Sequence, residues 1–103
     1  MANTFLNATA TLTDATETTI GTVPSARTWV LLGCNLANTS NSQISVDVKV
    51  ASTYVIKGAP IPAGSALSIL DGKIIAKATE TVTVTSASSS GDVDVVLSYM
   101  EQS

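Results

Sequence analysis

The segment "QISVDVKV", residues 43–50, decides the fold of this chain because apolar and polar side chains alternate along it without a break. Ile44, Val46, Val48 and Val50 occupy every second position. Period two is the pattern of a half-buried β-strand, whose successive side chains point to opposite faces. A helix would scatter these side chains around its axis, so the segment predicts a strand with one face in a core.

The same alternation returns near the end of the chain. It separates valines from threonines in "ETVTVTSA", residues 80–87, and recurs in "DVDVVLSYM", residues 92–100. The apolar face of the second segment carries Val93, Val95, Leu97 and Tyr99. Further β-prone segments cover residues 3–12, 17–23, 28–38, 53–57, 65–70 and 73–78. Proline, glycine and serine-rich turns separate them, at the spacing of about 8 to 12 residues that is typical of a sandwich or barrel.

We therefore expect an all-β fold, a single antiparallel β-sandwich that is jelly-roll-like and has about eight or nine short strands. One domain covers residues 1–103, since a chain of this length has no room for a second core. Residues 1–12 are expected to form an edge strand or an arm that reaches a neighbour. Such Thr-rich strands with few charges protect their edges poorly, and association with other subunits would cover them.

The segment "APIPAGSALSILDGKII", residues 59–75, is rich in turn residues. Pro60 and Pro62 fix φ and lack amide donors, which suits a sheet edge or a corner between sheets. Gly64 permits a sharp bend. The pair Asp71-Gly72 predicts a tight hairpin between the apolar segments on either side of it.

Nothing in the sequence indicates an enzyme. The chain has no histidine, which excludes triads of the Ser-His-Asp and Cys-His types and removes the commonest transition-metal ligand. Cys34 lies in an apolar run and is interpreted as a buried thiol. We expect no catalytic and no cofactor-binding residues.

Carboxylates offer the remaining candidate chemistry. Asp92 and Asp94 lie two positions apart, which puts them on the same face of a strand, and Asp47 is the third acid that such a site would use. Calcium takes about 6 to 8 oxygen ligands, and no loop supplies them. We interpret these acids as a solvated outer face, so no metal is expected.

Aromatic residues are few: Phe5, Trp29, Tyr54 and Tyr99. Trp29 adjoins "VLL" and is expected in the core. A carbohydrate-binding or adhesive module is the alternative function, and it requires Trp29 or Tyr54 exposed beside Asn or Asp. The glycosylation triplets at Asn7 and Asn38 are interpreted as chance matches, because the start of the sequence has no signal-peptide pattern.

Charge and hydropathy limit the partners. The five basic and eight acidic residues are scattered singly, without the basic stripe that a nucleic-acid partner requires. No apolar run approaches the roughly 20 residues of a membrane span. We expect synthesis in the cytoplasm. The combination of 45% hydrophobic with 13% charged residues favours burial against other subunits, as in a homo-oligomer.

Beside these patterns, the order of motifs resembles that of small β-sandwich virion structural proteins of tailed bacteriophages, including phages of cyanobacteria. The resemblance covers most of the chain. It consists of a "TVP" turn, "LAN", an alternating "VDVKV" strand, a "PIPAGS" corner, a "GKI" step, "VTVTS" and a closing strand. These correspond to residues 23–24, 36–38, 46–50, 60–65, 72–74, 82–86 and 94–101. The chain departs from the family at "AKATETVTV", residues 76–84, where the family has an "AGD" turn, so a different hairpin is expected there.

The resemblance implies a non-enzymatic virion protein. A decoration (cement) protein of the head, bound to the major capsid protein, is the leading expectation. A neck, tail or fibre-attachment protein is the alternative within the same family, and its partners would be neck or tail proteins. The implied place of the protein is the virion, after synthesis in the bacterial host.

Overall fold

The computed structural model describes residues 3–69 and 73–103 and contains nine strands in these ranges. They are β1 (Asn3–Leu12), β2 (Thr18–Thr22), β3 (Thr28–Asn38), β4 (Ile44–Val50), β5 (Thr53–Ile61), β6 (Ala66–Ser68), β7 (Ile74–Ala76), β8 (Thr81–Ser86) and β9 (Val93–Gln102). No helix long and apolar enough to cross a membrane occurs among the described residues.

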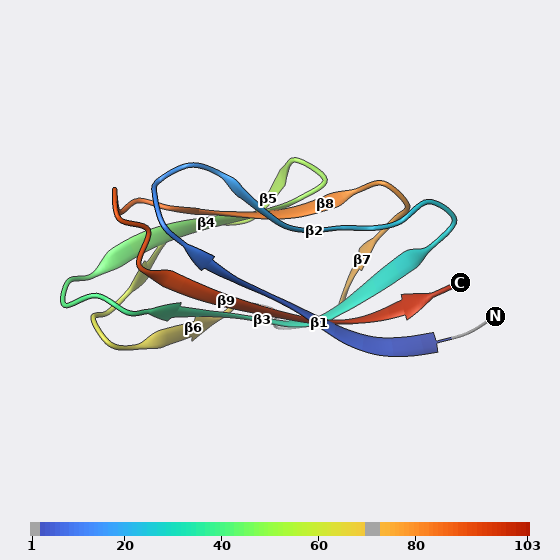
Figure 1. Cartoon of the computed structure of the whole chain (residues 1–103), viewed down its shortest axis with the longest axis horizontal. Coiled ribbons are helices and arrows are strands. Elements are labelled where there is room, and N and C mark those ends of the chain that lie inside the picture. Colours follow the sequence, from blue (N-terminus) through green and yellow to red (C-terminus); the bar gives the residue numbers. More distant parts are fainter. Residues whose placement is uncertain (1–2, 70–72) are drawn as a thin grey trace.

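The strands form two stacked sheets (Figure 1). Sheet A has the order β1-β9-β3-β6, and β7 also pairs with β3. Sheet B has the order β2-β8-β4-β5. All pairs are antiparallel. This confirms the predicted antiparallel sandwich.

The pairing follows a jelly roll, in which a long hairpin is rolled into two sheets. β1 pairs with β9, β2 with β8, β3 with both β6 and β7, and β4 with β5. Rolling the hairpin then sets β9 beside β3 and β8 beside β4. The topology confirms the jelly-roll prediction, with β6 and β7 together in the position of one strand.

The core lies between the sheets and is filled by alternate side chains of the long strands, with the alternation in β3 shifted by the β-bulge between Leu31 and Gly33. The alternating residues of the opening segment point inward, with Ile44, Val46 and Val48 buried and Val50 at the margin. Trp29 is also buried, stacks on Tyr99 at 3.9 Å between ring centroids, and donates from Nε1 to Glu101 Oε1 at 2.9 Å. Burial of these alternating side chains is what makes the two sheets pack.

The corner predicted at residues 60–65 is present. Pro60 lies in β5, an edge strand, where a missing amide donor is tolerated. After β5 the chain turns from sheet B to sheet A, with the Ser65 amide donating to the Pro62 carbonyl at 3.1 Å. Gly64 has a φ of 68°, which the turn requires and glycine adopts without strain.

The hairpin predicted around Asp71-Gly72 is wrong in its pairing. The two residues themselves lie outside the described part of the chain. The strands on either side, β6 and β7, do not pair with each other but follow one another along the same edge of β3. The Ile69 amide donates to the Cys34 carbonyl at 3.1 Å and continues the ladder beyond β6. Because β6 and β7 both lie along β3, Leu67, Ile69 and Ile74 all pack against the core. A hairpin between β6 and β7 would not place all three there.

The segment 77–80, where a different hairpin was expected, joins strands of different sheets. β7 belongs to sheet A and β8 to sheet B, so the chain crosses between layers here. The Glu80 amide donates to the Lys77 carbonyl, and the Lys77 amide to Glu80 Oε1. The Thr79 amide donates to the Val23 carbonyl and anchors the crossing to the start of the β2–β3 loop.

Candidate functional site

The outer face of sheet A carries a row of apolar side chains that crosses four strands. The register sets Phe5 of β1 opposite Met100 of β9, Met100 opposite Val30 of β3, and Val30 opposite Ile75 of β7. Phe5 is 74% exposed and Ile75 53% exposed. We call these four residues the apolar row. It is an apolar strip across the outer face of sheet A whose two ends, Phe5 and Ile75, are exposed, while Val30 between them is 9% exposed and Met100 is partly buried.

Two further exposed apolar side chains lie on this face outside the apolar row. Leu32 lies at the β-bulge of β3, where the register shifts between Leu31 and Gly33, and it is exposed. Val96 of β9, between Thr9 and Asn35, is exposed as well. Apart from Asp94, the strands contribute uncharged side chains to the rest of this face, among them Asn3, Asn7, Thr9, Thr11, Thr28, Asn35, Ser98 and Gln102.

Charge is almost absent from the strands of sheet A. They contain two charged residues, Asp94 and Glu101. Glu101 follows the inward parity of β9 and accepts from Trp29, so Asp94 alone faces outward. The outer face of sheet A is therefore a neutral surface over most of its length.

The outer face of sheet B differs in its chemistry. Lys49 of β4 forms an ion pair with Glu17 at 3.2 Å, and hydrogen bonding to Glu17 together with its charge raises the pKa of Lys49. Thr83 lies opposite Lys49 in the ladder, donates to Glu17 at 3.2 Å and is buried beneath them. The polar groups here satisfy one another, whereas the apolar row has no such partner among the described residues.

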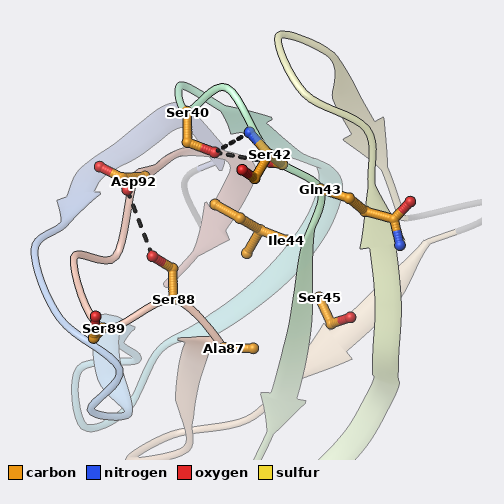
Figure 2. Close-up of a pocket in the computed structure, with 9 residues that line it drawn as sticks. All are labelled: Ser40, Ser42, Gln43, Ile44, Ser45, Ala87, Ser88, Ser89 and Asp92. Atoms are coloured by element: carbon orange, nitrogen blue, oxygen red, sulfur yellow. Dashed lines mark hydrogen bonds between the residues drawn. The ribbon is translucent and has the colours of Figure 1, made fainter.

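A second candidate is an open hollow of about 480 Å³ at one end of the sandwich. The β3–β4 and β8–β9 loops line it, and Ile44 points into the space between them (Figure 2). Its polar groups bond mainly to one another: Ser88 Oγ donates to Asp92 Oδ2 at 3.5 Å, and Ser40 Oγ lies 2.8 Å from the Ser42 carbonyl. The hollow is lined by hydroxyls that stabilise their own loops.

Asn38 holds this end of the molecule together. Its Nδ2 donates to the carbonyls of Ser42 and Ile61 at 2.7 and 2.9 Å, and its Oδ1 accepts from the amide and hydroxyl of Ser40. The side chain is 3% exposed. Because both amide hydrogens are used inside the fold, Asn38 cannot carry a glycan in this structure. Asn7, the asparagine of the other glycosylation triplet, lies exposed on β1.

The three acids do not form a site. Asp92 precedes β9 in a bend with a φ of 56°, so the strand geometry that was to pair it with Asp94 does not apply, and that prediction is wrong. Asp94 faces out from sheet A, and Asp47 of sheet B accepts from the Gly58 amide at 2.7 Å. Within the described ranges, no group of three or more acidic, Cys or His side chains could hold a metal ion.

The predicted burial of Cys34 and Trp29 is confirmed. Burial raises the pKa of the Cys34 thiol to about 11, so the nucleophilic thiolate is scarce at neutral pH. Tyr54 is exposed, but the ammonium groups of Lys49 and Lys57 lie 4.9 and 4.5 Å from its ring centroid. A sugar stacking on Tyr54 would compete with these cation–π contacts.

No model of a known protein family matches the chain, and no curated protein matches it at a significant level. Sequence reasoning missed the apolar row, because its members come from four distant segments. The exposed Phe5 in a polar strand was the one local signal for it.

Proposed function

We propose that this protein is a non-enzymatic structural component of a tailed-phage virion, and that it acts as a decoration protein that stabilises the head lattice. The observation that carries this proposal is the apolar row on the neutral outer face of sheet A. Such a surface favours a protein partner, since exposed contiguous apolar patches mark interaction sites. The resemblance of the motif order to that of phage virion proteins is the reason for proposing a phage particle as the partner.

The mechanism is non-covalent docking. Phe5, Ile75 and Leu32 would pack against an uncharged surface of the major capsid protein, and each square ångström of apolar surface buried contributes about 25 cal/mol. The Asn and Thr side chains around them would add hydrogen bonds of about 0.5 to 1.5 kcal/mol each. Repetition over a lattice turns a modest contact into a large stabilisation of the shell.

The test deletes the gene from the phage that carries it and adds purified protein back to the heads. We expect heads without the protein to lose DNA at lower temperature, and the wild-type protein to bind and restore them. The double variant Leu32→Ser/Ile75→Ser should bind at least about tenfold more weakly, because it removes apolar contacts from the docking face. Tyr54→Ser, which removes an exposed ring from sheet B, is the matched control and should bind normally.

Subunit counting in intact particles decides the location. Copies numbering in the hundreds on the head would support decoration, whereas one ring or a handful of copies would assign the protein to the neck, tail or a fibre attachment. Absence from the particle would overturn the proposal. Binding on a glycan array that Tyr54→Ser abolishes would instead establish the carbohydrate-binding alternative.

A further inference from the structure

The free edge of sheet A is the remaining feature without a partner. β1 is the first strand of that sheet, and none of the other described strands pairs with its far side. Its ten residues pair with β9 from Asn3 opposite Gln102 to Leu12 opposite Val93 without any shift in register. A long, regular edge strand of this kind is a template for another strand.

The other edges of the sandwich lack this property. β2 has five residues and a register shift near Gly21. β5 contains Pro60 and two register shifts against β4, and Asp47 accepts its Gly58 amide. β6 and β7 have three residues each. Among the described strands, β1 alone offers an unbroken edge.

We propose that β1 pairs antiparallel with β1 of a second copy across a two-fold axis, which joins the two A sheets into one continuous sheet. This dimer goes beyond the proposed function, because it names how two copies associate at the sheet edge beside the docking face. We assign a second copy as the partner, because among the described strands only β1 offers a long, regular free edge that could pair with β1. The two-fold uses both free edges, so the assembly closes and does not grow into a fibre.

Charge favours this self-pairing. β1 contains no charged residue, so two copies of a chain with net charge −3 meet along neutral strands. Like charges directly opposite each other across strands are destabilising, and edge lysines are the usual block to such pairing. β1 has neither obstacle.

The side chains also match. Antiparallel pairing about a two-fold places residues of equal parity opposite each other, so the outward and core faces of the two copies align. In the two longest registers, Asn7 or Ala8 lies opposite its own copy. Phe5 then faces Thr9 or Thr11 of the second copy, and Leu6 faces Ala8 or Ala10. Phe5 and Leu6 are 74% and 40% exposed in one copy, and the pairing would bring each of them into contact with β1 of the second copy.

Sedimentation equilibrium from about 1 µM to 1 mM tests the dimer. We expect wild-type protein to form a dimer, and Asn7→Lys/Thr9→Lys to raise the dissociation constant at least about tenfold. Thr19→Lys/Thr22→Lys adds the same charge to β2, the edge of sheet B, and should dimerise like wild type. Thermal unfolding shows that both variants fold. A wild-type protein that stays monomeric, or a dimer that the β1 variant does not weaken, overturns the inference.

Cross-linking locates the contact. The variant Asn7→Cys/Thr9→Cys should join two chains with a short thiol-specific reagent in either register, whereas Thr19→Cys/Thr22→Cys should not. Failure of this cross-link in a dimeric sample overturns the β1 pairing. The result is independent of head binding: a monomer that binds heads refutes the dimer alone, and a β1 dimer that ignores heads refutes the proposed function alone.

Discussion

Replacement of Asn38 by Asp tests the assignment of hydrogen bonds at the loop end of the sandwich. The change keeps the shape of the side chain and the Oδ1 acceptor for Ser40, but it removes both donors to the carbonyls of Ser42 and Ile61. The Ser42 carbonyl keeps Ser40 Oγ at 2.8 Å, but the buried Ile61 carbonyl is left unpaired, which costs about 1 to 3 kcal/mol. A domain of this size is stabilised by only about 5 to 15 kcal/mol. The melting temperature should fall by at least about 4 °C.

Urea unfolding followed by Trp29 fluorescence measures this loss, since the single tryptophan is buried in the fold. The new carboxyl would face two carbonyls, so its pKa in the folded state should lie above its unfolded value. Its protonated form can again donate to one carbonyl. The deficit should therefore shrink as pH falls from 7 towards 4. Asn41→Asp, exposed in the same loop, is the control. A difference below about 1 kcal/mol between these variants at pH 7 would refute the reasoning.

Two further predictions concern backbone and thiol. Gly91→Ala should unfold the protein or cost several kcal/mol of stability, because φ at Gly91 is 76° and a Cβ would collide with the Leu12 carbonyl. Gly33→Ala, which has open space around the new Cβ, should cost about 1 kcal/mol or less. Equal urea midpoints for the two variants would contradict this prediction. Cys34 should react with a disulfide reagent at pH 8 only as fast as the chain unfolds. Burial raises the folded pKa of Cys34 from 9.0 to about 11. Stability relative to Cys34→Ala should therefore be full below pH about 9 and fall by about 1.4 kcal/mol per pH unit up to about pH 11. Parallel pH profiles of the two proteins would exclude this effect.

Much of the fold follows from local sequence patterns. Alternation located β4, β8 and β9, and β-prone composition located β3 at residues 28–38 and β1 at residues 3–12 with the bounds that the structure has. These predictions succeed because burial of one face imposes period two on each strand. The prolines at 60 and 62 likewise predicted the edge and the corner, since a missing amide donor excludes a central strand.

The errors arise where pairing depends on distant residues. Turn chemistry suggested that β6 and β7 form a hairpin, but both pair with β3, and nothing local specifies that choice. Asp92 and Asp94 match the spacing of a shared strand face, yet the bend at Asp92 begins one residue before β9. Continuity of the apolar row is a property of register between four segments, and no single segment contains it.

The topology itself explains why the neutral edge matters. In a jelly roll the first strand pairs with the last and then has no neighbour on its other side, so β1 is an edge for reasons of chain path. Charges, bulges and prolines are the devices that protect such an edge, and the structure has them at β4–β5 and β2 but not at β1. The apolar row begins on the same strand, at Phe5. An unprotected edge beside an apolar neutral face is explained most simply if both are covered in the assembled state. In that state one strand pairing joins two copies and presents two apolar rows to a common partner.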